Sequence, residues 1–182
     1  MSAHRFIYML AGILLLLSCG SDNNAPIDDP GNTTNHYLQL QPNGLNAIKV
    51  SCTEENFVFP FQIKAVGNGS NQGGEAQINS WSEDELKAYN NKEKTSYVLL
   101  PSSLYSLTST EQVFKEGVSI MDVEVSFNPS KVFAEFREKG AEYVIALKLS
   151  SDKIQVRDSQ SEILLGISYD YPTASFATSF VE

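Results

Sequence analysis

The segment MDVEVSF, residues Met121–Phe127, alternates apolar and polar side chains without interruption. Successive side chains of a β-strand point to opposite faces of its sheet, so this pattern predicts a strand with one face in a core and the other in solvent. Tyr143–Leu149 repeats the alternation less strictly, and the apolar run in Ile163–Ile167 predicts a more fully buried closing strand. Further strands are predicted at Tyr37–Leu40, Ala47–Cys52, Phe57–Lys64 and Glu75–Ser80.

About seven such strands, joined by short segments rich in Asn, Gly, Pro and Ser, predict a mainly β protein with an antiparallel β-sandwich. Phe57–Lys64 places large apolar residues at its odd positions, but Pro60 cannot donate a hydrogen bond to a neighbouring strand. We therefore expect this strand at a sheet edge or with a local bulge. A weaker amphipathic stretch, Lys131–Glu138, predicts a helical turn between strands.

One short helix is predicted between the strands, from Glu83 to about Lys92. Ser82 with Glu85 three residues later is typical of a capping box, in which each side chain accepts a hydrogen bond from the other residue's backbone. Trp81 before the cap and Leu86 inside the helix match a hydrophobic staple, which fixes the angle at which the chain enters the helix.

The first residues resemble a bacterial lipoprotein signal. An apolar run, Phe6–Leu17, follows Arg5, and Ser18 precedes Cys19. The run is shorter than the roughly 20 residues that a membrane-spanning helix needs, which argues against an uncleaved anchor. We expect acylation of Cys19, against the alternative of an ordinary secretory signal with a chance cysteine. The predicted organisation is a signal peptide (1–18), a flexible polar tether (19–36), a β-sandwich domain (37–171) and a C-terminal tail (172–182).

A triacylated cysteine is a stable membrane anchor, because more than one acyl chain enters the bilayer. The polar stretch Gly20–Asn24 resembles the export signal of Bacteroidetes-type surface lipoproteins. We therefore expect a lipid-anchored protein of the outer membrane, exposed at the cell surface, with a periplasm-facing orientation as the alternative.

The composition excludes several classes of function. With 13 basic and 22 acidic residues the net charge is −9, and the basic residues are scattered, so nucleic acid is not an expected partner. Beyond the leader there is a single histidine, His36, which excludes histidine-based triads and zinc sites with several histidines. We predict no enzyme, no cofactor and no metal site, although calcium binding by loop carboxylates such as Asp152 and Asp158 stays open.

Three motifs in order, the helix Glu83–Asn90, then Tyr97–Pro101 and Tyr105–Leu107, resemble the domain-of-unknown-function 1735 family. The likeness continues through Asp122–Phe127 and Tyr143–Ser151. It implies an immunoglobulin-like sandwich that forms the N-terminal domain of surface lipoproteins. In this family such domains are often joined to glycan-binding modules or family 18 glycoside hydrolase domains. It also implies a role in glycan capture or processing. The tail 172–182 is too short for such a second module.

Aromatic side chains outside the strand patterns are the candidate ligand-binding residues, because sugar rings stack on aromatic faces. We expect Tyr169 and Tyr171 to lie beyond the last strand and to be the first candidates, followed by Trp81. Two functions remain. One is a non-catalytic glycan-binding or accessory module of a carbohydrate-utilisation system. The other is a structural or protein-interaction lipoprotein that docks onto other envelope proteins and has no small-molecule ligand.

Overall fold

Within residues 36–67, 73–139 and 141–170, which the computed structural model describes, the chain forms eleven strands, two α-helices and two 3-10 helices. These residues belong to one unit that begins at Thr33. The leader, most of the tether and the tail, and with them Cys19 and Tyr171, lie outside the described residues.

All seven strands predicted from the sequence are confirmed. They are β1 (His36–Gln41), β2 (Gly44–Ser51), β3 (Phe57–Gly67), β4 (Gly74–Ser80), β8 (Ile120–Phe127), β9 (Glu142–Ser150) and β11 (Glu162–Asp170). Four shorter strands were not predicted: β5 (Tyr97–Leu99), β6 (Tyr105–Leu107), β7 (Glu111–Phe114) and β10 (Gln155–Val156). The helices are α1 (Glu83–Glu93), α2 (Pro129–Lys139), η1 (Ser102–Leu104) and η2 (Asp158–Gln160).

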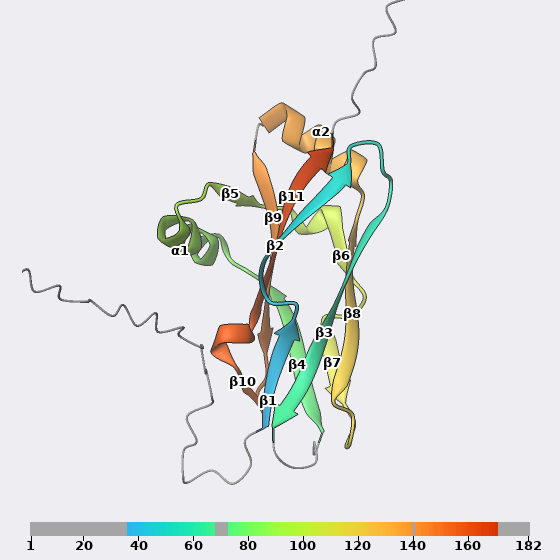
Figure 1. Cartoon of the computed structure of the whole chain (residues 1–182), viewed down its shortest axis with the longest axis vertical. Coiled ribbons are helices and arrows are strands. Elements are labelled where there is room, and N and C mark those ends of the chain that lie inside the picture. The colour runs from blue at the N-terminus through green and yellow to red at the C-terminus, as the bar shows by residue number, and fades with distance from the viewer. Residues whose placement is uncertain (1–35, 68–72, 140, 171–182) are drawn as a thin grey trace, which may run out of the picture. The chain divides into compact units, whose positions relative to one another are not determined.

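The strands form two sheets that pack face to face as a β-sandwich (Figure 1). One sheet has the order β10-β1-β3-β8-β6, and the other has the order β2-β11-β9-β4-β7 with β5 also paired to β9. The chain passes from the first sheet to the second between β1 and β2, at the cis peptide bond Gln41–Pro42.

The antiparallel prediction holds for most strand pairs but not for all. Three pairs are parallel: β1 with β10, β2 with β11, and β5 with β9. Side-chain alternation reports which face of a strand is buried and carries no information about the direction of its neighbour. The sequence therefore could not distinguish these three pairs from antiparallel ones.

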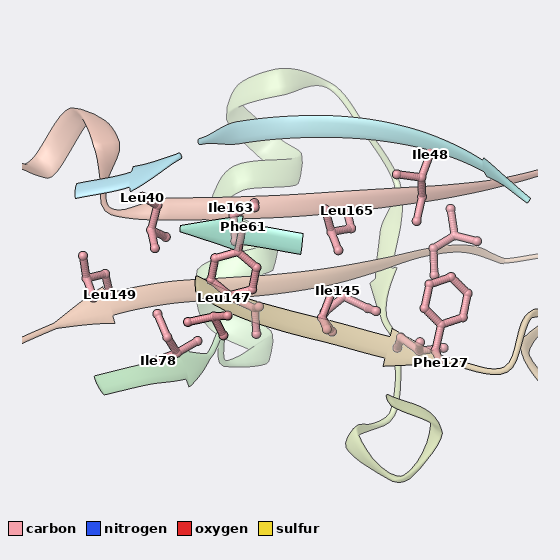
Figure 2. Packing of buried hydrophobic residues seen from close by; sticks show 14 of the residues in the cluster. Leu40, Ile48, Phe61, Ile78, Phe127, Ile145, Leu147, Leu149, Ile163 and Leu165 are labelled. Atoms are coloured by element: carbon pink, nitrogen blue, oxygen red, sulfur yellow. The ribbon is translucent and has the colours of Figure 1, made fainter. Parts of the chain in front are cut away.

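The main core lies between the two sheets (Figure 2). Val123, Val125 and Phe127 of β8 are buried there, whereas Asp122 and Glu124 are exposed, as the alternation in Met121–Phe127 predicts. From the opposite sheet, side chains of β9 and β11 such as Leu147 and Leu165 fill the same layer (Figure 2).

Pro60 lies in an interior strand, yet β1 does not pair with β3 at this position. β3 pairs with β8 along Phe57–Lys64 but with β1 only along Gln62–Gly67, since β1 ends at Gln41. Pro60 is opposite Glu124 of β8 and precedes the segment paired with β1. The prediction of an edge is thus correct for the part of the strand that contains the proline.

Helix α1 covers the outer face of the β9–β11 sheet (Figure 1). Leu86 from the helix and Trp81 before it form a second buried cluster with three residues of the sheet, Val144, Ala146 and Leu164. This cover explains why β9 and β11 are buried on both faces. The predicted bounds of the helix agree with the structure to within one residue.

Helix α2 replaces the helical turn predicted at Lys131–Glu138. Pro129 is its first residue, a position that tolerates the missing N–H. Asn128 Oδ1 accepts a hydrogen bond from Lys131 N at 2.9 Å, as an N-cap side chain does. Val132 is fully buried in the main core, so the helix is anchored by packing as well as by its cap.

Candidate functional site

A hollow among the described residues lies at the point where β9 changes its pairing partner from β4 to β5. On this side of the strand, β4 pairs with Leu147–Ser150 and β5 with Glu142–Val144. Just past the ends of these strands, Trp81 N donates to Ala146 O at 2.9 Å, and Leu100 N donates to Val144 O at 2.9 Å. β4 and β5 therefore diverge on either side of Ala146.

A hollow of about 370 Å³ opens between the two diverging strands. Its size is within the range of sites that bind small molecules. It is lined by Ser80, Trp81, Glu83, Leu99, Leu100, Pro101, Ser102, Tyr105 and Ala146.

Tyr105 is the more accessible of the two aromatic residues in this hollow. Its side chain is half-buried, whereas Trp81 is 7% exposed. The Tyr105 hydroxyl lies 2.6 Å from Ser80 Oγ, and this hydrogen bond fixes the ring at the end of β4. A ring held in this way offers an apolar face, and its hydroxyl offers a polar group at the edge.

Trp81 forms an inner wall and is not an open platform. Its ring packs against Tyr89 of α1 in an edge-to-face arrangement, with centroids 5.7 Å apart and an interplanar angle of 66°. Its Nε1 is buried, and no atom among the described residues accepts its hydrogen bond. Leaving a buried N–H without an acceptor costs about 1–3 kcal/mol.

The polar groups at the hollow are few and exposed. Ser80 and Ser102 supply hydroxyls, and Glu83 supplies the one charged side chain among the lining residues. Glycoside hydrolysis normally requires two carboxylic acids that flank the bond to be cleaved. A hollow lined by one carboxylate is therefore suited to binding a polar ligand with an apolar face, not to that chemistry.

A capping box fixes the wall of the hollow that Glu83 belongs to. Glu85 Oε2 accepts hydrogen bonds from Ser82 N and Ser82 Oγ, each at 2.7 Å, and Ser82 Oγ accepts from Glu85 N at 3.3 Å. Lys148 of β9 forms an ion pair with Glu85 Oε1, which joins the helix to the sheet. The hydrogen bond from Lys148 and those from Ser82 lower the pKa of Glu85 from 4.5 to about 2.

Asn90 holds the opposite wall in place by joining α1 to β5. Its Nδ2 donates to Tyr97 O at 2.8 Å, and its Oδ1 accepts from Tyr97 N at 3.1 Å and from Thr95 Oγ1 at 2.7 Å. The segment that leads through Leu99 and Pro101 to the hollow is thus attached to the same helix.

The structure corrects the expectation for Tyr169. This residue lies within β11, which extends to Asp170, and not beyond the last strand. Its side chain is 9% exposed, its ring packs on Phe133 of α2 with centroids 5.0 Å apart, and its hydroxyl donates to Pro129 O at 3.3 Å. Tyr169 is a core residue and offers no open ring face.

Of the two predicted ligand-binding residues that the structure describes, Trp81 lines the hollow, where it is largely buried, and Tyr169 does not. Tyr171 lies outside the described residues. Tyr105 is not among the residues predicted from the sequence, because the neighbouring Leu104 and Leu107 favour packing in a core at this position. The pairing of its hydroxyl with Ser80, 25 residues earlier, depends on the tertiary fold and leaves no local signal.

Among the described residues, no three His, Cys, Asp or Glu side chains come together in a way that could hold a metal ion. None of the helices in the described ranges is long and apolar enough to cross a membrane.

A family model described as an N-terminal domain matches residues 29–156, more than half of the chain. No curated protein matches significantly. Among solved structures, a Bacteroides ovatus protein to which carbohydrate binding has been ascribed aligns with a TM-score of 0.60 and 15% identity, over 72% of this chain and 36% of its own.

Two other solved structures share the fold. A Bacteroides ovatus multidomain protein that includes DUF1735 aligns with a TM-score of 0.55 and 14% identity, over 74% of this chain and 45% of its own. EndoBT-3987 of Bacteroides thetaiotaomicron, solved with a Man5GlcNAc product, aligns with a TM-score of 0.56 and 15% identity, over 73% of this chain and 31% of its own. The chain thus spans less than half the length of each of these three proteins.

Proposed function

Because the chain belongs to the domain-of-unknown-function 1735 family of N-terminal domains, we propose that it is a non-catalytic, glycan-binding or accessory module of the cell envelope. The site that we propose for the glycan is the hollow between β4 and β5. The observation that carries this proposal is the half-buried Tyr105 ring beside exposed hydroxyl and carboxylate groups.

The chemistry of the hollow suits a sugar. One face of a pyranose ring is apolar and stacks on an aromatic ring, while its hydroxyls require hydrogen-bonding partners at the edge. Tyr105 supplies the ring, and Ser102 and Glu83 supply partners for the hydroxyls. The context agrees, since similar folds occur in a protein to which carbohydrate binding has been ascribed and in one solved with a Man5GlcNAc product.

The test is a glycan array followed by calorimetry on the leaderless chain. Tyr105→Ala removes the ring, and Ser102→Trp fills the mouth of the hollow from an exposed position. Ser103→Trp is the matched control, because Ser103 is exposed beside Ser102 but does not line the hollow. Binding that is lost in the first two variants and kept in the control supports the proposal. Binding that all three variants keep places the site elsewhere.

The proposed location rests on the lipoprotein signal that ends at Cys19. Metabolic labelling with an alkyne fatty acid tests acylation, with Cys19→Ser as the control that must lose the label. Protease added to intact cells then distinguishes the two orientations. A surface-exposed protein is degraded, whereas a periplasm-facing protein is protected until the outer membrane is opened.

A protein-interaction role is the second candidate, and the position of β2 at the end of its sheet, within the described ranges, favours it. β2 is eight residues long, lies at the end of its sheet and is paired with β11 on one side. Its Leu45 side chain is 47% exposed. A long edge strand presents backbone groups that another chain can pair with.

Site-specific photo-crosslinking tests this role in whole cells. The probe replaces Leu45, with Val98 of β5, which is 40% exposed, as the matched control. A protein crosslinked from position 45 and not from position 98 supports the interaction role. Equal labelling at both positions contradicts it.

A further inference from the structure

We propose that the hollow between β4 and β5 selects sugars by charge, with Glu83 as the selecting group: it takes neutral sugars and amino sugars and rejects sugars that carry a carboxylate. This inference rests on the proposed function, because it names the class of glycan that the same site binds.

The charge of the hollow's lining comes from one side chain. Glu83 is the one ionisable acid or base among the residues that line the hollow apart from the Tyr105 phenol, and it is exposed at the first position of α1. No lysine, arginine or histidine lines the hollow to receive an anion. A ligand carboxylate would therefore approach a carboxylate without a compensating cation from the lining.

The N-terminal end of α1 adds further acidic residues beside the hollow. The N-terminus of an α-helix alone would attract an anion through its dipole and its free N–H groups. The first turn of α1, however, carries Glu83, Asp84 and Glu85. The ion pair with Lys148 balances only Glu85, and the capping box occupies Ser82 and Glu85. The net charge of this turn therefore remains negative, which opposes an anionic ligand.

The carboxylate of Glu83 also determines which ligand groups can form hydrogen bonds with it. An ionised carboxylate only accepts hydrogen bonds, so Glu83 requires donors from the ligand. Sugar hydroxyls are such donors, and the ammonium group of an amino sugar is a charged donor, which makes the hydrogen bond stronger. The expected order of affinity is amino sugar, then neutral sugar, then uronic acid.

The experiment uses matched methyl glycosides of glucose, galactose and mannose, each in its neutral, 2-amino and 6-carboxylate forms. Affinities for the leaderless chain are measured by ligand-observed NMR at low salt. We expect the carboxylate form of the preferred sugar to bind roughly tenfold more weakly than its neutral form, as for like charges a few ångströms apart in a partly screened site. Raising the salt concentration to 1 M should reduce this difference.

Glu83→Gln should bring the neutral and carboxylate forms to within about threefold of each other. Asp84→Asn, which removes a charge from the same turn without touching the hollow's lining, should keep most of the difference. Thermal melts of both variants confirm that they are folded.

Three results would overturn the inference, and they differ in what they say of the proposed function. Carboxylate forms that bind as well as neutral forms, with binding lost in Tyr105→Ala, overturn charge selection and leave glycan binding intact. If the affinity difference between neutral and carboxylate forms is unchanged in Glu83→Gln, Glu83 is not the selecting group. Absence of binding by all nine glycosides overturns both proposals.

Discussion

Glu85 should contribute measurably to stability, because it closes the capping box and also pairs with the sheet. Two substitutions, Glu85→Gln and Glu85→Ala, separate these contributions. The first removes the charge but keeps an acceptor for Ser82 N, whereas the second removes every hydrogen bond that this carboxylate accepts.

The expected loss of stability follows from the pKa of Glu85, which the hydrogen bonds from Lys148 and Ser82 lower from 4.5 to about 2. The linkage between proton binding and folding converts this pKa shift into at most about 3 kcal/mol of folding stability. Both partners of the ion pair are more than a third exposed, at 39% for Lys148 and 38% for Glu85, so solvent screening lowers the figure to about 1–2 kcal/mol. We expect a loss of about 1 kcal/mol for Glu85→Gln and about 2 kcal/mol for Glu85→Ala at pH 7.

The dependence on pH has a definite sign. A carboxyl group whose pKa is depressed in the folded state stabilises the fold fully above its ordinary pKa of 4.5 and loses this effect as the pH falls toward 2. Urea denaturation at pH 7, 4 and 2.5 should therefore show the gap between wild type and variant narrowing as the pH falls. Asp84→Asn is the control and should change stability by less than about 0.5 kcal/mol. A gap that is equally wide at pH 2.5 and pH 7 would show that the charge of Glu85 does not contribute to stability.

Three further predictions concern packing and charge. Tyr169→Phe should lower the free energy of unfolding by about 1 kcal/mol, because it removes the hydrogen bond to Pro129 O. Tyr169→Ala should lower it by about 3–5 kcal/mol in the same urea denaturation assay, because it also removes the buried ring. If neither substitution changes stability, the ring is not in the core. Leu86→Ala should lose about 2–5 kcal/mol in the same assay, because Leu86 is 2% exposed in the cluster under α1. Partial burial and the carboxylate of Glu85 raise the pKa of Glu162, so its charged form weakens the fold above the ordinary pKa of 4.5. Glu162→Gln should therefore raise the melting temperature at pH 7 and not at pH 3.5, and a lower melting temperature at pH 7 would contradict this.

Features that depend on neighbours in sequence were predictable. The alternation in β8 and the Ser82–Glu85 capping box are written in a few consecutive residues, and the structure confirms both. The cover that α1 places over β9 and β11 also left a signal, because it made the strands apolar on both faces.

Features that depend on contacts between distant segments were not predictable in this way. The apolar run in Ile163–Ile167 predicts a strand that ends near Ile167. In the structure the strand continues, since β2 pairs with it as far as Asp170. The hollow could not be predicted for the same reason. It exists because β4 and β5, which α1 separates in the sequence, pair with different parts of β9.

The parallel pairing of β2 with β11 has a mechanical consequence. Gly44–Ser51 lies beside Ile163–Asp170 in register, near opposite ends of the described chain. Tension applied between the two ends would pull these strands in opposite directions along their length, so the hydrogen bonds between them would share the load instead of opening one at a time. In a domain that is held at one end and pulled at the other, β2 and β11 would thus resist the force in shear geometry. Force spectroscopy would record this resistance as a high unfolding force.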